Sequence, residues 1–177
     1  TLEMRDWTAA AANPIPNYTY RYNNPSSIDL TDNKLIIGSA TVGTTSNFIY
    51  NGIQGLVQRA YNFQSWDQPG LTTSMADAKT GLTTIGVSTG AARGGLGPTD
   101  TDLFAGQTIT GASVIAMYTY AGDANLDGVI DGGDYGVIDN NVQIAGADGY
   151  ANGDFNFDGG IEGGGYGIND NNNQGQG

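Results

Sequence analysis

Residues 122–141 read GDANLDGVIDGGDYGVIDNN, and residues 153–172 nearly repeat them as GDFNFDGGIEGGGYGINDNN. Both copies are rich in aspartate, asparagine and glycine. Ca²⁺ takes about six to eight oxygen ligands, and an EF-hand loop supplies them from positions 1, 3, 5, 7, 9 and 12, with glycine at position 6 for a sharp turn. The repeat therefore predicts a pair of calcium-binding loops.

The first copy offers an oxygen ligand at every position of such a loop, and Gly128 stands where the turn requires glycine. We therefore expect a strong Ca²⁺ site, the alternative being a solvated turn rich in aspartate and glycine. Its predicted ligands are the side chains of Asp123, Asn125, Asp127, Asp131 and Asp134 and the backbone carbonyl of Val129.

The second copy lacks one ligand, because position 12 is Gly165, which has no side chain. One carboxylate fewer lowers both the negative charge and the ligand count, so we expect a second, weaker Ca²⁺ site. Asp139 and Asp170 follow position 12 by five residues in each copy, and we expect them to be caps or solvated charges. The predicted ligands of the second loop are Asp154, Asn156, Asp158, Gly160 through its carbonyl, and Glu162.

The charge distribution supports a cation-dependent tail. The net charge is −12, and residues 121–177 hold ten of the 18 acidic side chains and none of the six basic ones. Self-repulsion at this density opposes compaction unless cations are bound, and it disfavours nucleic acid as a partner. The chain has no cysteine and no histidine, which excludes disulfides, thiolate metal sites and histidine-activated nucleophiles. No apolar run approaches the length of a membrane span.

Residues 1–120 read mostly as strands and turns, with one helix near 46–61 that begins at Ser46 or Asn47. The predicted fold class is mainly β, a β-sandwich or jelly-roll-like domain with one packed helix and an extended N-terminal arm. A small module of two calcium loops follows at 121–177. The predicted strands are 34–42, 82–88, 107–110 and 112–120, the last of them central because it is apolar on both faces. A helical turn at 73–79, a loop at 91–102 and an edge strand or arm within 11–27 complete the prediction.

The paired loops resemble the type I dockerin module, in which two calcium loops, each followed by a helix, pack against one another. Upstream stretches such as SSIDLTDNKLIIG and IYNGIQGLVQRAY resemble the module that commonly precedes dockerin-like repeats at the C-termini of secreted proteins of planctomycetes and related bacteria. This resemblance implies two bound Ca²⁺ ions and an extracellular setting. The segments after the loops, YGVIDNNVQ and YGINDNNNQ, lack Lys and Arg and are poor helix formers, which matches a cohesin-binding face badly.

No catalytic set is recognisable, so an enzyme is not predicted. Asp67, beside Trp66 and before a Pro-Gly turn, is more plausibly a turn or cap residue than a catalytic acid. We expect a secreted, calcium-stabilised structural protein of the bacterial cell surface or extracellular matrix, self-assembling as a homo-oligomer, filament or layer through its β domain. The alternative is a dockerin-type binding module that attaches a spacer or carbohydrate-binding domain to a protein scaffold or glycan.

Overall fold

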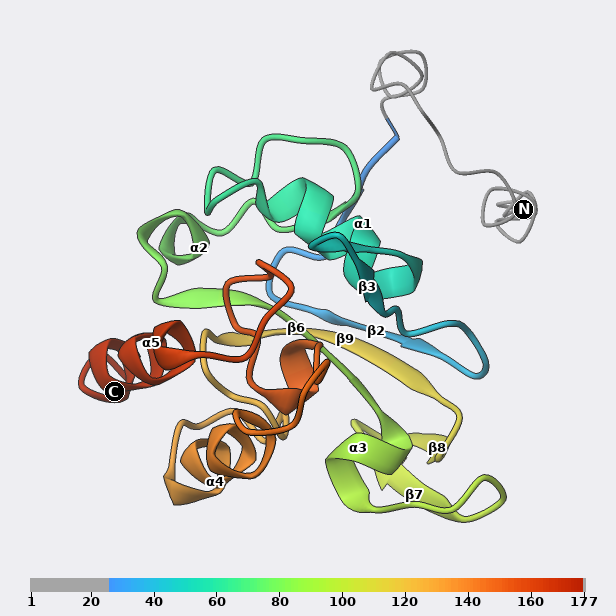
Figure 1. Cartoon of the computed structure of the whole chain (residues 1–177). Coiled ribbons are helices and arrows are strands. Elements are labelled where there is room, and N and C mark those ends of the chain that lie inside the picture. Colours follow the sequence, from blue (N-terminus) through green and yellow to red (C-terminus); the bar gives the residue numbers. More distant parts are fainter. Residues whose placement is uncertain (1–25, 177) are drawn as a thin grey trace.

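The computed structural model describes residues 26–176 (Figure 1). The predicted N-terminal arm falls mainly at residues 1–25, outside the described part. A three-stranded antiparallel sheet lies at the centre, in the order β2 (Lys34–Ile37), β9 (Val114–Tyr120), β6 (Thr83–Thr89). β6 and β9 were both predicted, and β9 is the central strand as expected because nearly all of its side chains are buried.

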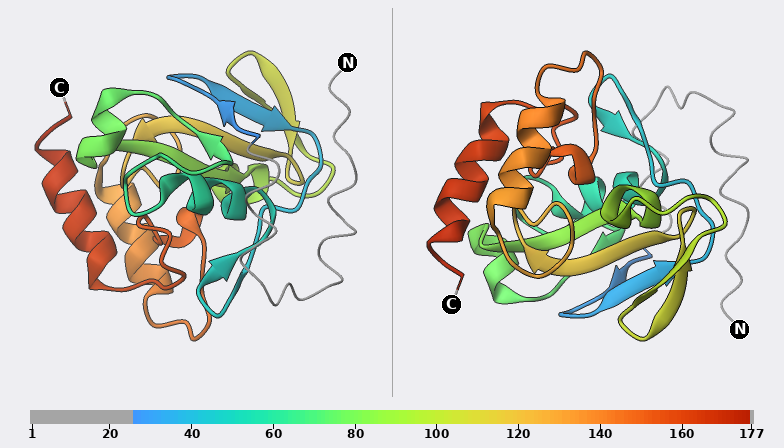
Figure 2. Two further views of the ribbon diagram at one scale, coloured as in Figure 1. Left: turned by 90° about the horizontal axis from the view of Figure 1, so that it is seen from above. Right: turned by 90° about the horizontal axis from the view of Figure 1, so that it is seen from below.

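Short two-stranded pairs and helices surround this sheet. The pairs are β1 (Ile28–Asp29) with β5 (Leu71–Thr72), β3 (Thr45–Ser46) with β4 (Ile49–Tyr50), and β7 (Thr101–Phe104) with β8 (Gln107–Thr110). The helices are α1 (Gly52–Tyr61), α2 (Ala76–Thr80), α3 (Gly90–Gly94), α4 (Gly132–Asn141), the 3₁₀ turn η3 (Tyr150–Asn152) and α5 (Gly163–Asn173). Figure 1 shows α1 and α2 above the sheet, α4 below it and α5 beside its left-hand end, and Figure 2 gives views from above and below.

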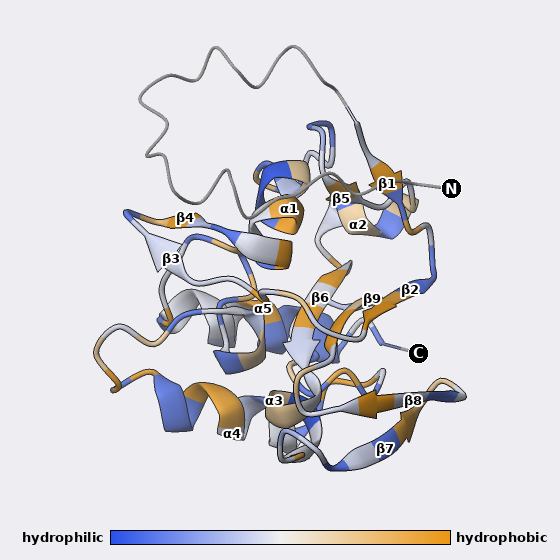
Figure 3. Ribbon diagram, turned by 90° about the vertical axis from the view of Figure 1, so that its right-hand side faces the viewer, coloured by the Kyte–Doolittle hydropathy of each residue, from blue (hydrophilic) through white to orange (hydrophobic). Residues whose placement is uncertain are grey.

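The predicted mainly-β sandwich is confirmed only in part, because the structure has several antiparallel sheets but is not clearly a sandwich. Only β6 and β9 reach seven residues, and the two-residue strands at β1, β3, β4 and β5 cannot form a second sheet to pack against the first. Helices cover the sheet instead, so the described residues form a mixed fold with several antiparallel sheets. In Figure 3 the apolar residues concentrate on strands such as β2, β8 and β9. No helix within residues 26–176 is long and apolar enough to cross a membrane.

The predicted helix near 46–61 begins later than expected, at Gly52 after the N-cap Asn51. Asn47 and Phe48 take positive φ angles of 50° and 64°, which makes the tight turn between β3 and β4 instead of a first helical turn. The loop predicted at 91–102 likewise starts with helix α3, because the Thr89 side chain caps it by accepting the Ala92 N–H at 3.0 Å. The helical turn predicted at 73–79 is confirmed as α2.

Apolar side chains from both sides of residue 120 form one buried cluster. The tail residue Tyr150 is fully buried and packs against Gly86 of β6, where a Cβ would lie 2.7 Å from the tyrosine ring. Glycine inside a strand often marks such a close approach. At the other end of the tail, the buried amide of Asn172 donates to the carbonyls of Gly81 and Ala121, both at 2.9 Å. The tail therefore packs on β6 through Tyr150 and binds the end of α2 through Asn172.

The two helices of the tail bind each other through a reciprocal pair of hydrogen bonds. Tyr135 of α4 donates to Asp170 of α5 at 2.8 Å, and Tyr166 of α5 donates to Asp139 of α4. Because Tyr135 and Tyr166 are equivalent positions of the repeat, the pairing has an approximate two-fold symmetry. Asp139 and Asp170 thus each accept a hydrogen bond from the opposite helix. These bonds support α4 and α5, whose sequences have low helix propensity.

Candidate metal centres

The first loop is organised around Asp123, whose side chain is fully buried. Its Oδ1 accepts the N–H of Asp127 at 3.1 Å, and its Oδ2 accepts the N–H of Gly128 at 2.9 Å. The Thr119 hydroxyl, near the end of β9, donates to the same Oδ2. Gly128 has a φ of +96°, which glycine adopts without strain, so the chain turns around this carboxylate as the EF-hand pattern requires.

Two further predicted ligands accept hydrogen bonds from the next residues of this loop. Asn125 Oδ1 accepts the N–H of Asp127 at 2.8 Å, and Asp127 Oδ1 accepts the N–H of Val129 at 3.0 Å. The Asn125 amide also donates to Asp127 Oδ2 at 2.9 Å. Side chains of Asn and Asp that bond to backbone two residues ahead form turns, and successive turns curl the loop around its acidic side chains. The side chain of Val129 is half exposed, as its predicted role needs only its carbonyl.

The last two predicted ligands form a capping box at the start of α4. Asp131 is the N-cap and accepts the N–H of Gly133 at 2.7 Å, while Asp134 Oδ2 accepts the N–H of Asp131 at 2.9 Å. Asp134 is fully buried, and its Oδ1 reaches back to the N–H groups of Ala124 at 2.8 Å and Asn125 at 3.4 Å. Position 12 therefore ties the start of the loop to its end.

These carboxylates repel one another without a cation. The pKa of Asp123 is raised to about 6, mainly by burial and in part by the neighbouring charge of Asp134, against the hydrogen bonds that lower it. Burial likewise raises the pKa of Asp134, to which the charge of Asp127 adds. Burial and like charges both disfavour the ionised form, and a bound cation would favour it.

The second loop repeats this construction around Asp154, which is 1% exposed. Asp154 Oδ1 accepts the N–H of Asp158 at 3.1 Å, and its Oδ2 accepts the N–H of Gly159 at 2.8 Å. The Tyr50 hydroxyl of β4 donates to the same Oδ2 at 2.6 Å. Thr119 makes the equivalent hydrogen bond to Asp123 in the first loop. Burial raises the pKa of Asp154 to about 6.

The following turns also match those of the first loop. Asn156 Oδ1 accepts the N–H of Asp158 at 3.3 Å, and Asp158 Oδ1 accepts the N–H of Gly160 at 3.0 Å. Gly160, whose carbonyl is a predicted ligand, therefore lies on the same turn as its counterpart Val129. The two loops share one backbone plan up to this point.

The second loop differs from the first where its helix begins. Glu162 is the N-cap of α5, but its side chain makes no capping bond. Gly165, at position 12, is buried, and a Cβ there would lie 2.7 Å from the carbonyl oxygen of Gly153. The Gly153 carbonyl thus leaves no room for a side chain at position 12. This explains why glycine stands where the first loop has Asp134.

The donor chemistry of both loops fits Ca²⁺, which prefers carboxylate, amide and carbonyl oxygens. Within residues 26–176, no group of three or more acidic side chains converges closely enough to hold a metal ion. The carboxylate oxygens instead accept backbone N–H groups inside each loop. The predicted ligands of each loop thus lie on consecutive turns of that loop. Their coordination of a metal ion stays a prediction.

Sequence reasoning missed two residues that position these loops. Thr119 lies four residues before Asp123, so its nearness in the chain was a usable signal. Tyr50 is 104 residues from Asp154, and nothing in the sequence connects them. Thr119 lies in β9 and Tyr50 lies in β4. Each loop is therefore bound to a strand of the first 120 residues through its first aspartate.

Comparisons with known proteins find no match for this chain among family models, curated proteins or solved structures.

Proposed function

We propose that the chain is a secreted, calcium-stabilised structural protein of the bacterial cell surface or extracellular matrix, which assembles with further copies of itself. The observation that carries this proposal is the anchoring of both loops. Their buried first aspartates, Asp123 and Asp154, are bound by hydroxyls of Thr119 and Tyr50. A cation in each loop would therefore act on the attachment of the tail to strands β9 and β4.

Calcium would be held by the carboxylate, amide and carbonyl oxygens of the two loops, and it would supply positive charge. The chain's own residues do the rest. The buried aspartates fix the turns, the capping box of Asp131 and Asp134 starts α4, and the Tyr–Asp pairs hold α4 against α5. A ligand that binds only the folded state stabilises it by linkage, so calcium at extracellular levels would strengthen the tail.

Assembly is supported by the edge of the central sheet. β2 pairs with β9 on one side, and within residues 26–176 its other side pairs with no strand. Its residues Leu35, Ile36 and Ile37 are apolar and only partly buried. An unpaired apolar edge is a template for strand addition by another chain, and head-to-tail addition gives open filaments when the rotation does not close.

The contacts of Asp67 support a structural rather than catalytic reading of that residue. Its Oδ1 accepts the amide N–H groups of Asn62 at 2.7 Å and Gln68 at 3.2 Å. These bonds lower the pKa of Asp67, which keeps it ionised in an exposed turn. A catalytic proton donor or acceptor would need a raised pKa or a second acidic group beside it.

Electron microscopy of the purified full chain, with Ca²⁺ and with a chelator, tests the proposal. We expect filaments or layers in Ca²⁺. Ile37→Lys should abolish them, because a lysine on an edge strand blocks strand addition. Ile144→Lys, at a position 57% exposed and outside any strand, is the matched control and should assemble normally. A monodisperse monomer at high concentration in both conditions would contradict self-assembly.

A second candidate function is a binding module that recognises a glycan. It is favoured by one observation, a groove of about 1050 Å³ beside the second loop. This surface is separate from the β2 edge and needs its own explanation.

A further inference from the structure

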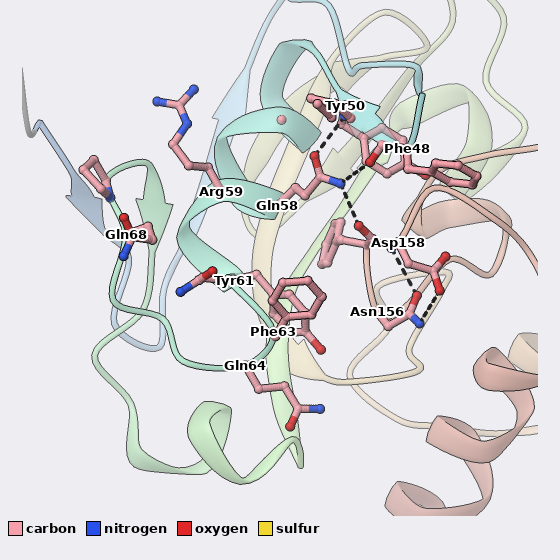
Figure 4. Close-up of a pocket in the computed structure, with 15 residues that line it drawn as sticks. Phe48, Tyr50, Gln58, Arg59, Tyr61, Phe63, Gln64, Gln68, Asn156 and Asp158 are labelled. Atoms are coloured by element: carbon pink, nitrogen blue, oxygen red, sulfur yellow. Dashed lines mark hydrogen bonds between the residues drawn. The ribbon is translucent and has the colours of Figure 1, made fainter. Parts of the chain in front are cut away.

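The groove lies where three segments meet, as Figure 4 shows. The turn between β3 and β4 contributes Phe48, the end of α1 and the residues after it contribute Phe63, and the second loop contributes Asn156. Gln58 of α1 joins these walls. Its amide oxygen accepts the N–H of Tyr50 at 2.9 Å, and its amide nitrogen donates to the carbonyls of Phe48 and Phe157, both at 2.8 Å. The groove is therefore a built feature of the fold.

Two phenylalanines of this groove are unusually exposed, Phe48 at 74% and Phe63 at 91%. Both also have left-handed backbones, with φ angles of 64° and 53°. For a residue other than glycine this conformation is strained. Exposure of a large apolar ring is unfavourable as well. Folding stability alone would favour glycine or asparagine at these two positions, so the rings are explained better by binding.

The strain is concentrated around the groove. Ten residues other than glycine have positive φ in the described part of the chain, and five of them line this one surface. Strained backbone that clusters at one surface is a frequent mark of a binding site. The five are Phe48, Asn62, Phe63, Gln64 and Phe157.

The polar lining consists mainly of side-chain amides, which both donate and accept hydrogen bonds. The charged lining residues are Arg59 and Asp158, one of each sign, in a chain whose net charge is −12. A nearly neutral, amide-rich surface does not select an ion. The overall negative charge also repels acidic polymers. The chemistry therefore fits a neutral ligand that carries many hydroxyl groups and apolar patches.

We propose that this groove binds a neutral oligosaccharide chain. Sugar rings present apolar C–H faces that pack on exposed aromatic rings, and their hydroxyls match amide donors and acceptors. Phe48 and Phe63 would each pack against a sugar ring, while amides such as Gln64 and Gln68 bond to its hydroxyls. This inference rests on the second candidate function and not on assembly, so its failure leaves the structural proposal untouched.

Binding of the full chain to an array of neutral oligosaccharides tests the proposal, with hexamers of glucose, mannose, xylose, galactose and N-acetylglucosamine and an acidic polyuronate for comparison. Calorimetry on the best ligand then compares variants. We expect Phe63→Gly and Phe48→Ala each to weaken binding about tenfold or more, a difference of roughly 1.4 kcal/mol. Phe63→Tyr should retain binding, and Leu103→Ala, an exposed strand residue of β7, is the matched control and should bind like wild type.

Phe63→Gly carries a second readout, because glycine suits a φ of 53° and should leave the thermal midpoint unchanged or higher. Binding lost without loss of stability is the signature of a binding residue. The proposal is overturned by the absence of binding to every neutral array member, by unchanged affinity in both phenylalanine variants, or by preference for the polyuronate. Self-association that Phe63→Gly abolishes, without any sugar binding, would assign the groove to a second copy of the chain instead.

Discussion

The hydroxyl of Tyr50 lies 2.6 Å from Oδ2 of Asp154, so a side chain of β4 holds the first residue of a loop 104 positions away. The same hydroxyl accepts the N–H of Gly149 at 2.6 Å. Tyr50→Phe should therefore destabilise the protein by about 1–3 kcal/mol, because it leaves buried polar groups without their partner. Urea denaturation at fixed Ca²⁺ measures this effect.

Tyr166→Phe is the control for the loss of a tyrosine hydroxyl, because its bond to Asp139 is exposed. That variant should cost less than Tyr50→Phe, because an exposed bond leaves no buried polar group without its partner. Equal effects of the two variants would mean that Tyr50 has no special part in holding the second loop.

Asp134 closes the first loop by accepting three backbone N–H groups while buried. Asp134→Ala should cost about 2 kcal/mol or more in metal-free buffer, since the capping box and the loop closure are lost together. Denaturation of the chelated protein checks this, with Asp102→Ala, at an exposed position of β7, as control. A neutral effect would show that the loop closes without its position-12 carboxylate.

Gly165→Asp tests why the second loop lacks that carboxylate. A Cβ at Gly165 would lie 2.7 Å from the Gly153 carbonyl oxygen, so the substitution should destabilise the protein rather than complete a stronger calcium site. Gly163→Asp, two residues earlier in α5, meets no atom within 4 Å and is the control. Tighter calcium binding by Gly165→Asp at unchanged stability would refute the steric explanation.

Stability should depend on pH when metal is absent. Burial raises the pKa of Asp123 and of Asp154 to about 6, above the ordinary value near 4 for an unfolded chain. The folded state thus holds these protons more tightly, so their stabilising contribution is complete below about pH 4 and is lost as the pH rises through about 6. In metal-free buffer, the free energy of unfolding should fall over this range.

Saturating Ca²⁺ should remove this fall, because the cation favours the ionised carboxylates. The double variant Asp123→Asn, Asp154→Asn should flatten it in metal-free buffer. Denaturation between pH 4 and 7 measures both effects. A metal-free stability that rises through this window, or a double variant with the wild-type slope, would contradict the assignment.

Local patterns in the sequence predicted some parts of this structure well. β9 is apolar on both faces and is the central strand, and the turn positions of both loops fall where the EF-hand spacing puts them. Such features depend on neighbouring residues, so the sequence carries them directly. The start of α1 was predicted too early, because Asn47 and Phe48 adopt positive φ where helical periodicity continues.

The fold class was predicted only in part, for a different reason. Alternating short apolar segments suggested a sandwich, but the helices of the tail and α1 supply the cover that a second sheet would have given. Tyr150 packs on Gly86, and Tyr50 binds Asp154, contacts that join residues 64 and 104 positions apart. A single sequence holds no local signal for either. The choice of glycine at position 165 is likewise explained only by the nearby Gly153 carbonyl.

Calorimetric titration of Ca²⁺ into the metal-free full chain tests the central claim most directly. We predict two binding events of different affinity. Asp127→Ala should remove the tighter event and lower the thermal midpoint in Ca²⁺ more than Asp158→Ala, which should remove the weaker one. A chain that binds no Ca²⁺ at millimolar concentration, with a thermal midpoint unaffected by chelation, would contradict the claim that calcium holds this tail in place.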